Sequence, residues 1–135
     1  MANEKTFQAQ VLTPEGSRFS GDVVSVSVPG ASGSFQMLHN HAPIISALDV
    51  GRVEIQKPDN STLTYAVSGG FVEMNDNQVT LLAERAIEPG DIDVEEAKKK
   101  LSDAKEKLKD SSAMLSDVEH QIKDAQNLIK MAGNS

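Results

Sequence analysis

The spacing of hydrophobic residues changes once along this chain, near Pro89-Gly90. Before that point, apolar residues recur at every second position in short runs that Gly, Pro, Asn and Asp separate. After it, they recur at alternating steps of three and four, and no glycine follows until Gly133. A period of two is typical of strands and a period near 3.6 of helices. The sequence therefore predicts a strand domain, residues 1–88, followed by a helical domain, residues 89–135.

The strand half contains short apolar runs that turn-forming residues separate. They cover residues 7–11, 24–28, 35–38, 44–48, 52–56, 63–67, 71–74 and 78–83. Asn75-Asp76-Asn77 predicts a hairpin loop between the last two runs, and residues 57–61 predict a turn by their composition. Short strands at this spacing are typical of a sandwich or a barrel, and we predict an antiparallel β-sandwich of about 8–10 strands.

The helical half predicts an antiparallel α-helical hairpin, so the fold class is α+β. Asp93 and Glu96 fit a capping box at the start of the first helix. Asp110-Ser111-Ser112 then interrupts the pattern. Each helix carries one apolar seam, formed by Ala97, Leu101, Ala104 and Leu108 in the first and by Leu115, Val118, Ile122, Ala125, Ile129 and Ala132 in the second.

Alanine recurs along both seams, which limits the apolar area that the two helices can bury together. Burial stabilises by about 25 cal/mol per Å², so each alanine contributes little. Isolated helices of this length are also marginal in water. Our hypothesis is that the hairpin is weakly held and can open when a better surface is offered.

Composition excludes several classes of protein. The net charge of −7 argues against a nucleic-acid-binding surface, which is normally basic. The chain has no cysteine, no apolar run long enough to span a bilayer and no signal-peptide pattern. All three arginines precede residue 90, whereas the helical half has eight lysines and no arginine. Arginine is the residue best suited to bidentate phosphate contact.

Residue patterns for catalysis are sparse. His39 and His41 lie two apart in a predicted loop, but no third metal ligand is evident. Ser68-Gly69-Gly70 lacks the Lys-Ser/Thr pair and the helix of a phosphate-binding loop, so close backbone approach explains these glycines better. We predict no active site, no metal and no cofactor.

Four strings give the chain a specific resemblance. "FSGDVVSVSVPGASGSFQML", "HAPIISAL", "YAVSGGFVEMNDNQVTLLAERAI" and "DIDVEEAKKKL" follow one another in this order. With them, nearly the whole chain resembles the epsilon-subunit family of F-type ATP synthases, the counterparts of the mitochondrial delta subunit.

The resemblance implies a non-catalytic rotor subunit. In that family the sandwich binds the gamma subunit and the c ring, and couples them during proton-driven ATP synthesis. The helical hairpin folds down, or extends along gamma towards the alpha and beta subunits and inhibits ATP hydrolysis. The implied location is peripheral, on the cytoplasmic face of a bacterial inner membrane, without insertion into the bilayer. A plastid-encoded protein on the stromal side of the thylakoid would look similar.

By position, the family's loop that faces the c ring falls on residues 35–43. The implied contact residues are Phe35, Met37, Leu38, His39, Asn40, His41, Ala42 and Pro43. The family's usual "PGHAP" is replaced here by His39-Asn40 before His41-Ala42-Pro43. Asparagine can adopt the left-handed conformation of a glycine, so we expect the turn to be retained.

Some bacterial members of the family bind ATP in the folded hairpin through an "(I/L)DxxRA" string and arginines of the second helix. The matching string here is Ile92-Asp93-Val94-Glu95-Glu96-Ala97, with glutamate in place of arginine. A carboxylate repels a triphosphate, so this site is degenerate at Asp93, Glu96 and Ala97, and we predict weak or no ATP binding.

Five lysines of the first helix are candidates for a regulatory contact with an acidic surface of alpha or beta: Lys98, Lys99, Lys100, Lys105 and Lys109. A solvated helix face is the more common reason for such a run of lysines.

Two other classes of protein stay open at this point. A stand-alone ligand-binding β-sandwich with a helical tail would never associate with a membrane ATPase. An enzyme that uses His39 and His41 would purify with stoichiometric metal.

Overall fold

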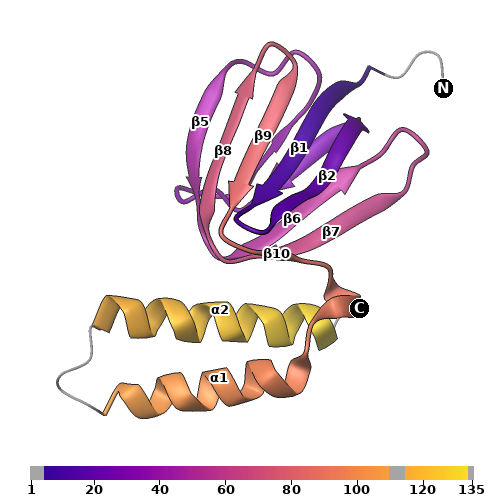
Figure 1. Ribbon diagram of the computed structural model, residues 1–135. Coiled ribbons are helices and arrows are strands. Elements are labelled where there is room, and N and C mark those ends of the chain that lie inside the picture. Colours follow the sequence, from indigo (N-terminus) through magenta and orange to yellow (C-terminus); the bar gives the residue numbers. More distant parts are fainter. Residues whose placement is uncertain (1–4, 110–114, 134–135) are drawn as a thin grey trace. The chain divides into compact units, whose positions relative to one another are not determined.

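The computed structural model describes residues 5–109 and 115–133, which form ten strands, a short 3-10 helix and two α-helices. The chain divides into two compact units, Met1–Ala86 and Ile87–Ser135. The first is a two-sheet β-sandwich and the second is a helical hairpin, as Figure 1 shows. The predicted α+β class and the order of its two parts are confirmed.

Each sheet of the sandwich has five strands within the described residues. One has the order β2 (Gly16–Val23), β1 (Phe7–Thr13), β9 (Gln78–Ala83), β8 (Gly70–Asn75), β5 (Ile44–Leu48). The other has the order β10 (Ala86–Ile87), β7 (Thr62–Val67), β6 (Gly51–Gln56), β3 (Ser25–Val28), β4 (Phe35–Met37). The predicted antiparallel pairing needs one correction, since β1 and β9 are parallel. These two strands are far apart in the sequence, and a long connection permits parallel pairing.

The sequence pattern failed to predict β2 and β10. Strand β2 reads GSRFSGDV and lies at the edge of its sheet, where only Val23 is fully buried. Its register with β1 shifts between Val11 and Leu12, so Arg18 has no partner in the ladder. An exposed edge strand with a bulge carries no alternating apolar signal. Strand β10 has only two residues, which is too short for any period to show.

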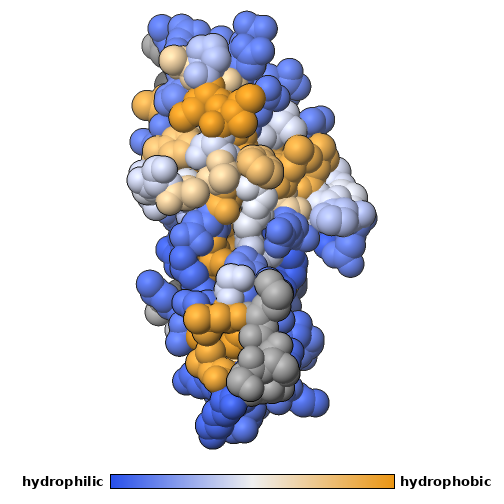
Figure 2. All heavy atoms as spheres, turned by 90° about the vertical axis from the view of Figure 1, so that its left-hand side faces the viewer, coloured by the Kyte–Doolittle hydropathy of each residue, from blue (hydrophilic) through white to orange (hydrophobic). Residues whose placement is uncertain are grey.

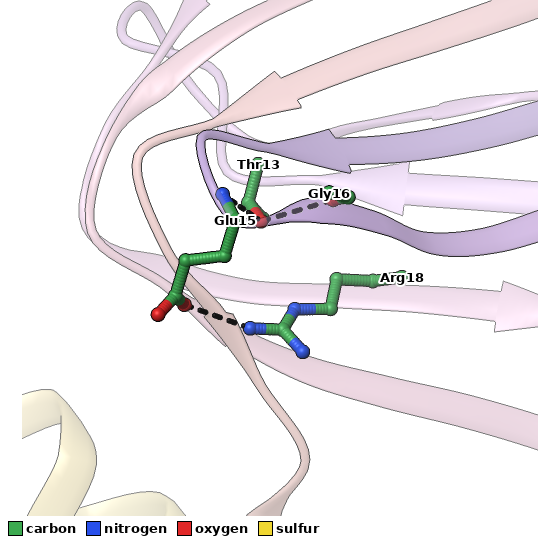
Figure 3. Close-up of polar contacts among 4 residues, drawn as sticks. All are labelled: Thr13, Glu15, Gly16 and Arg18. Carbon is green, nitrogen blue, oxygen red and sulfur yellow. Dashed lines mark hydrogen bonds and ion pairs between the residues drawn. The ribbon is translucent and has the colours of Figure 1, made fainter.

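A tight turn joins β1 to β2 (Figure 3). The hydroxyl of Thr13 donates to the carbonyl oxygen of Gly16 at 3.0 Å and accepts from the backbone N–H of Glu15 at 3.3 Å. The guanidinium of Arg18 lies 2.9 Å from the carboxylate of Glu15. Because this ion pair is exposed, it contributes little, and the two hydrogen bonds of the Thr13 hydroxyl define the turn.

The predicted turn at residues 57–61 is confirmed. The backbone N–H of Lys57 donates to the carbonyl of Ser61 at 2.9 Å, and that of Asn60 donates to the carbonyl of Lys57 at 3.0 Å. The hydroxyl and backbone N–H of Ser61 both donate to the carboxylate of Asp59, at 2.6 and 2.9 Å. These hydrogen bonds stabilise the charged carboxylate and lower the pKa of Asp59, the hydroxyl contributing most.

The sandwich core is aliphatic, and both sheets contribute to it. In β1, Phe7, Ala9 and Val11 are buried and alternate with more exposed glutamines, as predicted. The buried phenol of Tyr65 in β7 is satisfied, since its hydroxyl donates to the carbonyl of Arg18 in β2 at 3.0 Å. That hydrogen bond ties the two sheets together at one edge.

Gly70 marks a close backbone approach, as the sequence predicts for Ser68-Gly69-Gly70. Its φ is +132°, and an added Cβ would lie 2.0 Å from the carbonyl oxygen of Leu82. We expect Gly70→Ala to lower the free energy of unfolding by about 3 kcal/mol, since overlap and backbone strain both oppose the change. Urea denaturation followed by circular dichroism measures this. Gly90→Ala is the control, because an added Cβ there meets nothing within 4 Å. Equal midpoints for the two variants would contradict the argument.

The second unit begins with the 3-10 helix η1 (Pro89–Asp91), followed by α1 (Val94–Lys107) and α2 (Leu115–Gly133), which pack together as the predicted antiparallel hairpin (Figure 1). Asp93 is the N-cap of α1, and its carboxylate accepts from the backbone N–H of Glu96 at 3.0 Å. The carboxylate of Glu96, which was expected to complete the capping box with Asp93, lies 3.1 Å from the ammonium group of Lys100. It therefore points along the helix. The predicted connection Asp110-Ser111-Ser112 lies outside the described residues.

The predicted helical seams are partly wrong in both helices. Ala97 and Ala104 are buried in α1, while Leu108, just after the helix, is 48% exposed. In α2 the buried residues are Val118, Ala125, Leu128 and Met131. Of the other predicted seam residues, Leu115 is 62% exposed, and Ile122, Ile129 and Ala132 are half-buried. The prediction missed Leu128 and Met131. Besides α1, α2 also contacts η1, and a helix with two neighbours buries a wider face than a single seam.

Candidate functional site

The loop between β4 and β5 keeps the turn that the sequence predicts. The backbone N–H of His41 donates to the carbonyl of Leu38 at 3.1 Å, which closes a turn over residues 38–41. Asn40 lies inside it with a φ of +66°, in the left-handed region. Asparagine therefore occupies the conformation for which glycine is the usual residue.

A reciprocal pair of hydrogen bonds joins this loop to the turn between β8 and β9. The backbone N–H of Asn40 donates to the side-chain oxygen of Asn77 at 2.6 Å. The side-chain nitrogen of Asn77 donates to the side-chain oxygen of Asn40 at 3.0 Å. Asp76 and Asn77 have φ of +51° and +57°, which makes the predicted hairpin loop a two-residue type I′ turn. Two loops that are 37 positions apart in sequence thus meet at one end of the sandwich.

The structure separates the eight predicted contact residues of residues 35–43 into two groups. Leu38, Asn40, Ala42 and Pro43 are exposed, and His39 and His41 are half-buried, so all six belong to the accessible loop. Phe35 is half-buried and packs against the core. Met37 has no exposed surface. Phe35 and Met37 therefore anchor the loop, and the other six residues face outwards.

The two loop histidines gather no metal-binding partners. No group of three or more His, Cys, Asp or Glu within residues 5–109 and 115–133 could hold a metal ion. The ring nitrogen Nδ1 of His41 lies 2.7 Å from the carbonyl oxygen of Ala42. A carbonyl only accepts, so this nitrogen carries the proton and fixes the ring against its own loop.

A row of apolar side chains on the outer face of the first sheet was not predicted. In the register of the strands, Ala47 of β5 lies opposite Phe71 of β8, Phe71 opposite Leu82 of β9, and Leu82 beside Leu12 of β1. Phe71 and Leu82 are 58% and 52% exposed. Ile45, two residues from Ala47 on the same face of β5, is exposed as well. We call these five residues the apolar row. Side chains of this size seldom line up on a solvated sheet face without a partner.

Sequence reasoning could have found the apolar row. Four of its members belong to apolar doublets, Val11-Leu12, Ile44-Ile45, Phe71-Val72 and Leu81-Leu82. Because side chains alternate between the faces of a strand, a doublet must place one apolar residue outside. Val11, Val72 and Leu81 point into the core, so their neighbours point out. In Figure 2, which faces the side of the molecule that carries β5 in Figure 1, hydrophobic surface is exposed on the sandwich.

The predicted regulatory lysines lie on exposed parts of α1 and just after it. Lys98, Lys99, Lys100, Lys105 and Lys109 are all exposed. Lys100 pairs with Glu96, and Lys109 lies 3.5 Å from Glu106. These are pairs of neighbouring residues on a solvated face, which a partner surface can replace at little cost.

A shallow groove of about 360 Å³ runs between α1 and α2, over the buried alanines Ala104 and Ala125. Its charged lining residues are Lys100, Lys107, Asp103 and Asp124, so positive and negative groups balance. Of the predicted nucleotide string, Asp93 caps the helix, Glu96 is paired with Lys100, and Ala97 is buried. The groove therefore lacks the excess positive charge that a triphosphate requires.

Comparison with known proteins gives one consistent family. Residues 6–89 match the model of the ATP synthase delta/epsilon chain β-sandwich domain. The chain is 46% identical over 93 residues to an ATP synthase epsilon chain of Halalkalibacterium halodurans, covering 69% of both chains. It is 40% identical over 83 residues to that of Chlorobaculum tepidum, covering 62% of this chain and 94% of the relative.

Among solved structures, a chain of the Euglena gracilis mitochondrial ATP synthase, in an assembly of OSCP, F1 and c ring, matches with a TM-score of 0.77 and 20% identity. That match covers 96% of this chain and 82% of the other, and it confirms the fold. None of the described helices is long and apolar enough to cross a membrane.

Proposed function

The chain belongs to the ATP synthase delta/epsilon family, and from that premise we propose that it is the epsilon-type rotor subunit that couples a gamma subunit to a c ring. Its relatives are epsilon chains, which are accessory and not catalytic subunits of the synthase. In this proposal residues 1–88 bind the partners, and residues 89–135 regulate ATP hydrolysis. The observation that carries it is the sandwich itself, which matches the family model and exposes two distinct surfaces.

The first surface is the apolar row, which we assign to the gamma subunit. Its central residues Phe71 and Leu82 lie opposite one another on β8 and β9, in the interior of the sheet. An aromatic side chain among aliphatic ones on a flat, rigid face is the composition of an interface centre. Strands β8 and β9 are paired on both sides, so the surface is fixed before a partner arrives.

The second surface is the end of the sandwich that carries residues 38–43, which we assign to the polar loops of the c ring. It differs from the apolar row in chemistry, since imidazole, amide and backbone groups surround the single large apolar side chain of Leu38. A surface of this kind suits a polar partner.

The regulatory role rests on the weak packing of the hairpin. Two of the side chains at its centre, Ala104 and Ala125, are alanines, and a groove remains above them. Leu108 and Leu115 are 48% and 62% exposed, so these leucines remain largely accessible in the folded hairpin. Two arrangements of similar free energy are what a movable inhibitory element requires. We assign the exposed lysines of α1 to contacts with alpha and beta in the extended arrangement.

We expect the isolated chain not to bind ATP. Glu96 replaces the arginine of the family string, and the groove between the helices has no net positive charge. Isothermal titration calorimetry with MgATP should show no binding at micromolar concentrations, and Glu96→Arg should raise the affinity. A micromolar dissociation constant for the unmodified chain would contradict the expectation.

The proposed function as a whole is tested by reconstitution. The full chain is added to membranes that carry an ATP synthase from the same source but lack this subunit. ATP-driven proton pumping, followed by quenching of a pH-sensitive dye, should recover with one chain per gamma subunit. A chain that neither co-sediments with the membranes nor restores pumping is not a rotor subunit. That outcome would favour the stand-alone ligand-binding sandwich. We place the chain on the membrane face that carries the catalytic head.

A further inference from the structure

We propose that Asn77 is a positioning residue for the loop that meets the c ring. Through its two hydrogen bonds with Asn40 it joins the β4–β5 loop and the β8–β9 turn into one rigid surface. This inference rests on the proposed function, because it concerns the same end of the sandwich. It adds that the β8–β9 turn belongs to that surface, including the exposed carboxylate of Asp76.

The β4–β5 loop depends on this pair for its conformation. Asn40 holds a left-handed φ of +66°, which is unfavourable for a residue with a Cβ. Within residues 38–41, the backbone N–H of His41 donates to the carbonyl of Leu38. The backbone N–H of Asn40, by contrast, points outside the loop and donates to Asn77 at 2.6 Å. The side chain of Asn40, which a glycine lacks, accepts the return bond at 3.0 Å.

Asn77 is suited to hold another loop because it is itself fixed. It is the second residue of a two-residue type I′ turn between two ladder-paired strands. Its carbonyl accepts from the backbone N–H of Gln8 in β1 at 3.1 Å. Strands β1, β8 and β9 therefore all hold Asn77 in place. A loop fastened to such a point loses less conformational freedom when a partner binds, and binds more tightly for that reason.

The test uses glycine substitutions, because glycine keeps a positive φ and removes only the side chain. Asn77→Gly places a glycine directly after Asp76, and type I′ turns favour an Asp-Gly pair, so the turn itself should survive. Asn40→Gly removes the other half of the hydrogen-bonded pair. Asn60→Gly is the matched control, since Asn60 also has a positive φ, +72°, but lies in the turn between β6 and β7.

Two measurements on full-length chains separate positioning from mere stability. Hydrogen exchange by NMR on the isolated chain reports the Asn40 amide. We expect its exchange to be about tenfold faster in Asn77→Gly, as loss of a hydrogen bond of ordinary strength implies, and unchanged in Asn60→Gly. The dissociation constant for a gamma–c-ring assembly should rise about three- to tenfold in Asn77→Gly and Asn40→Gly. The double variant should be no weaker than either single variant, because both remove one pair.

Each outcome decides something. Unchanged Asn40 exchange in Asn77→Gly, or faster exchange with unchanged affinity, would overturn the positioning role. Equal loss of affinity in Asn60→Gly would overturn it too, since the effect would then be one of general stability. If the unmodified chain fails to bind the gamma–c-ring assembly, the proposed function is wrong, and so is this inference, which rests on it. In that case none of the variants binds the assembly either.

Discussion

Replacing Phe71 with glutamate is expected to weaken binding to the gamma subunit about a thousandfold. Phe71 lies at the centre of the apolar row, opposite Leu82 and Ala47. In the complex that we propose, the new carboxylate would be buried against apolar side chains without a partner. Such a charge costs about 4 kcal/mol, which corresponds to this loss of affinity.

Phe71→Glu tests the interface and not the fold, because the side chain of Phe71 is 58% exposed. Leu38→Glu is the matched control, since Leu38 is 50% exposed on the same unit but lies at the loop end. Surface plasmon resonance against an alpha–beta–gamma assembly should show the loss for Phe71→Glu alone. Equal affinity of the two variants would place gamma elsewhere on the sandwich. With a gamma–c-ring assembly, Leu38→Glu should weaken binding as well.

The sequence predicted those parts of the fold in which one face of an element is buried and the other is solvated. The alternation of Phe7, Ala9 and Val11 is such a case. The Asp93 cap of α1 was predictable for a different reason, because a cap depends only on residues that are neighbours in the sequence. Prediction failed where an element is not buried on one face alone. Strand β2 is an edge strand with both faces largely exposed, and α2 has two neighbours in place of one. The spacing of apolar residues reflects which face of an element is buried. An element that is exposed on both faces, or that packs against two neighbours, therefore departs from the simple spacing of a strand or a helix.

The candidate site, too, could be predicted from the sequence only in part. Resemblance placed the loop at residues 35–43, but it could not show that Met37 turns into the core while Leu38 turns out. Nor could it show that Asn40 is held by Asn77, because no local rule connects residues in different loops. The apolar row was readable in the doublets, but only with the register of four strands does it become a continuous surface. Pairing between distant strands is the information that a single sequence carries least directly.

Removing the helical hairpin is expected to abolish inhibition of ATP hydrolysis and to leave gamma binding intact. A chain that ends at Glu88 retains all ten strands, both sandwich surfaces and the whole sandwich core. It lacks α1 and α2, and therefore every lysine that we assign to alpha and beta. Steady-state hydrolysis by an alpha–beta–gamma assembly, titrated with each chain, measures the effect. The full chain should slow hydrolysis at saturation, whereas the shortened chain should compete with it for gamma and restore the rate.

Competition between the full and the shortened chain for gamma shows which domain inhibits hydrolysis. If the shortened chain binds gamma and still slows hydrolysis, inhibition comes from the sandwich, and the weak seam of Ala104 and Ala125 has no regulatory meaning. If neither chain slows hydrolysis but both bind, the protein acts in coupling alone. The packing favours the first expectation, because the alanines among the buried residues contribute little apolar area and Leu108 and Leu115 stay exposed, which lowers the cost of opening the helix pair. An extended hairpin can bury those leucines against a partner, and that gain of apolar contact offsets the contacts broken in the folded hairpin.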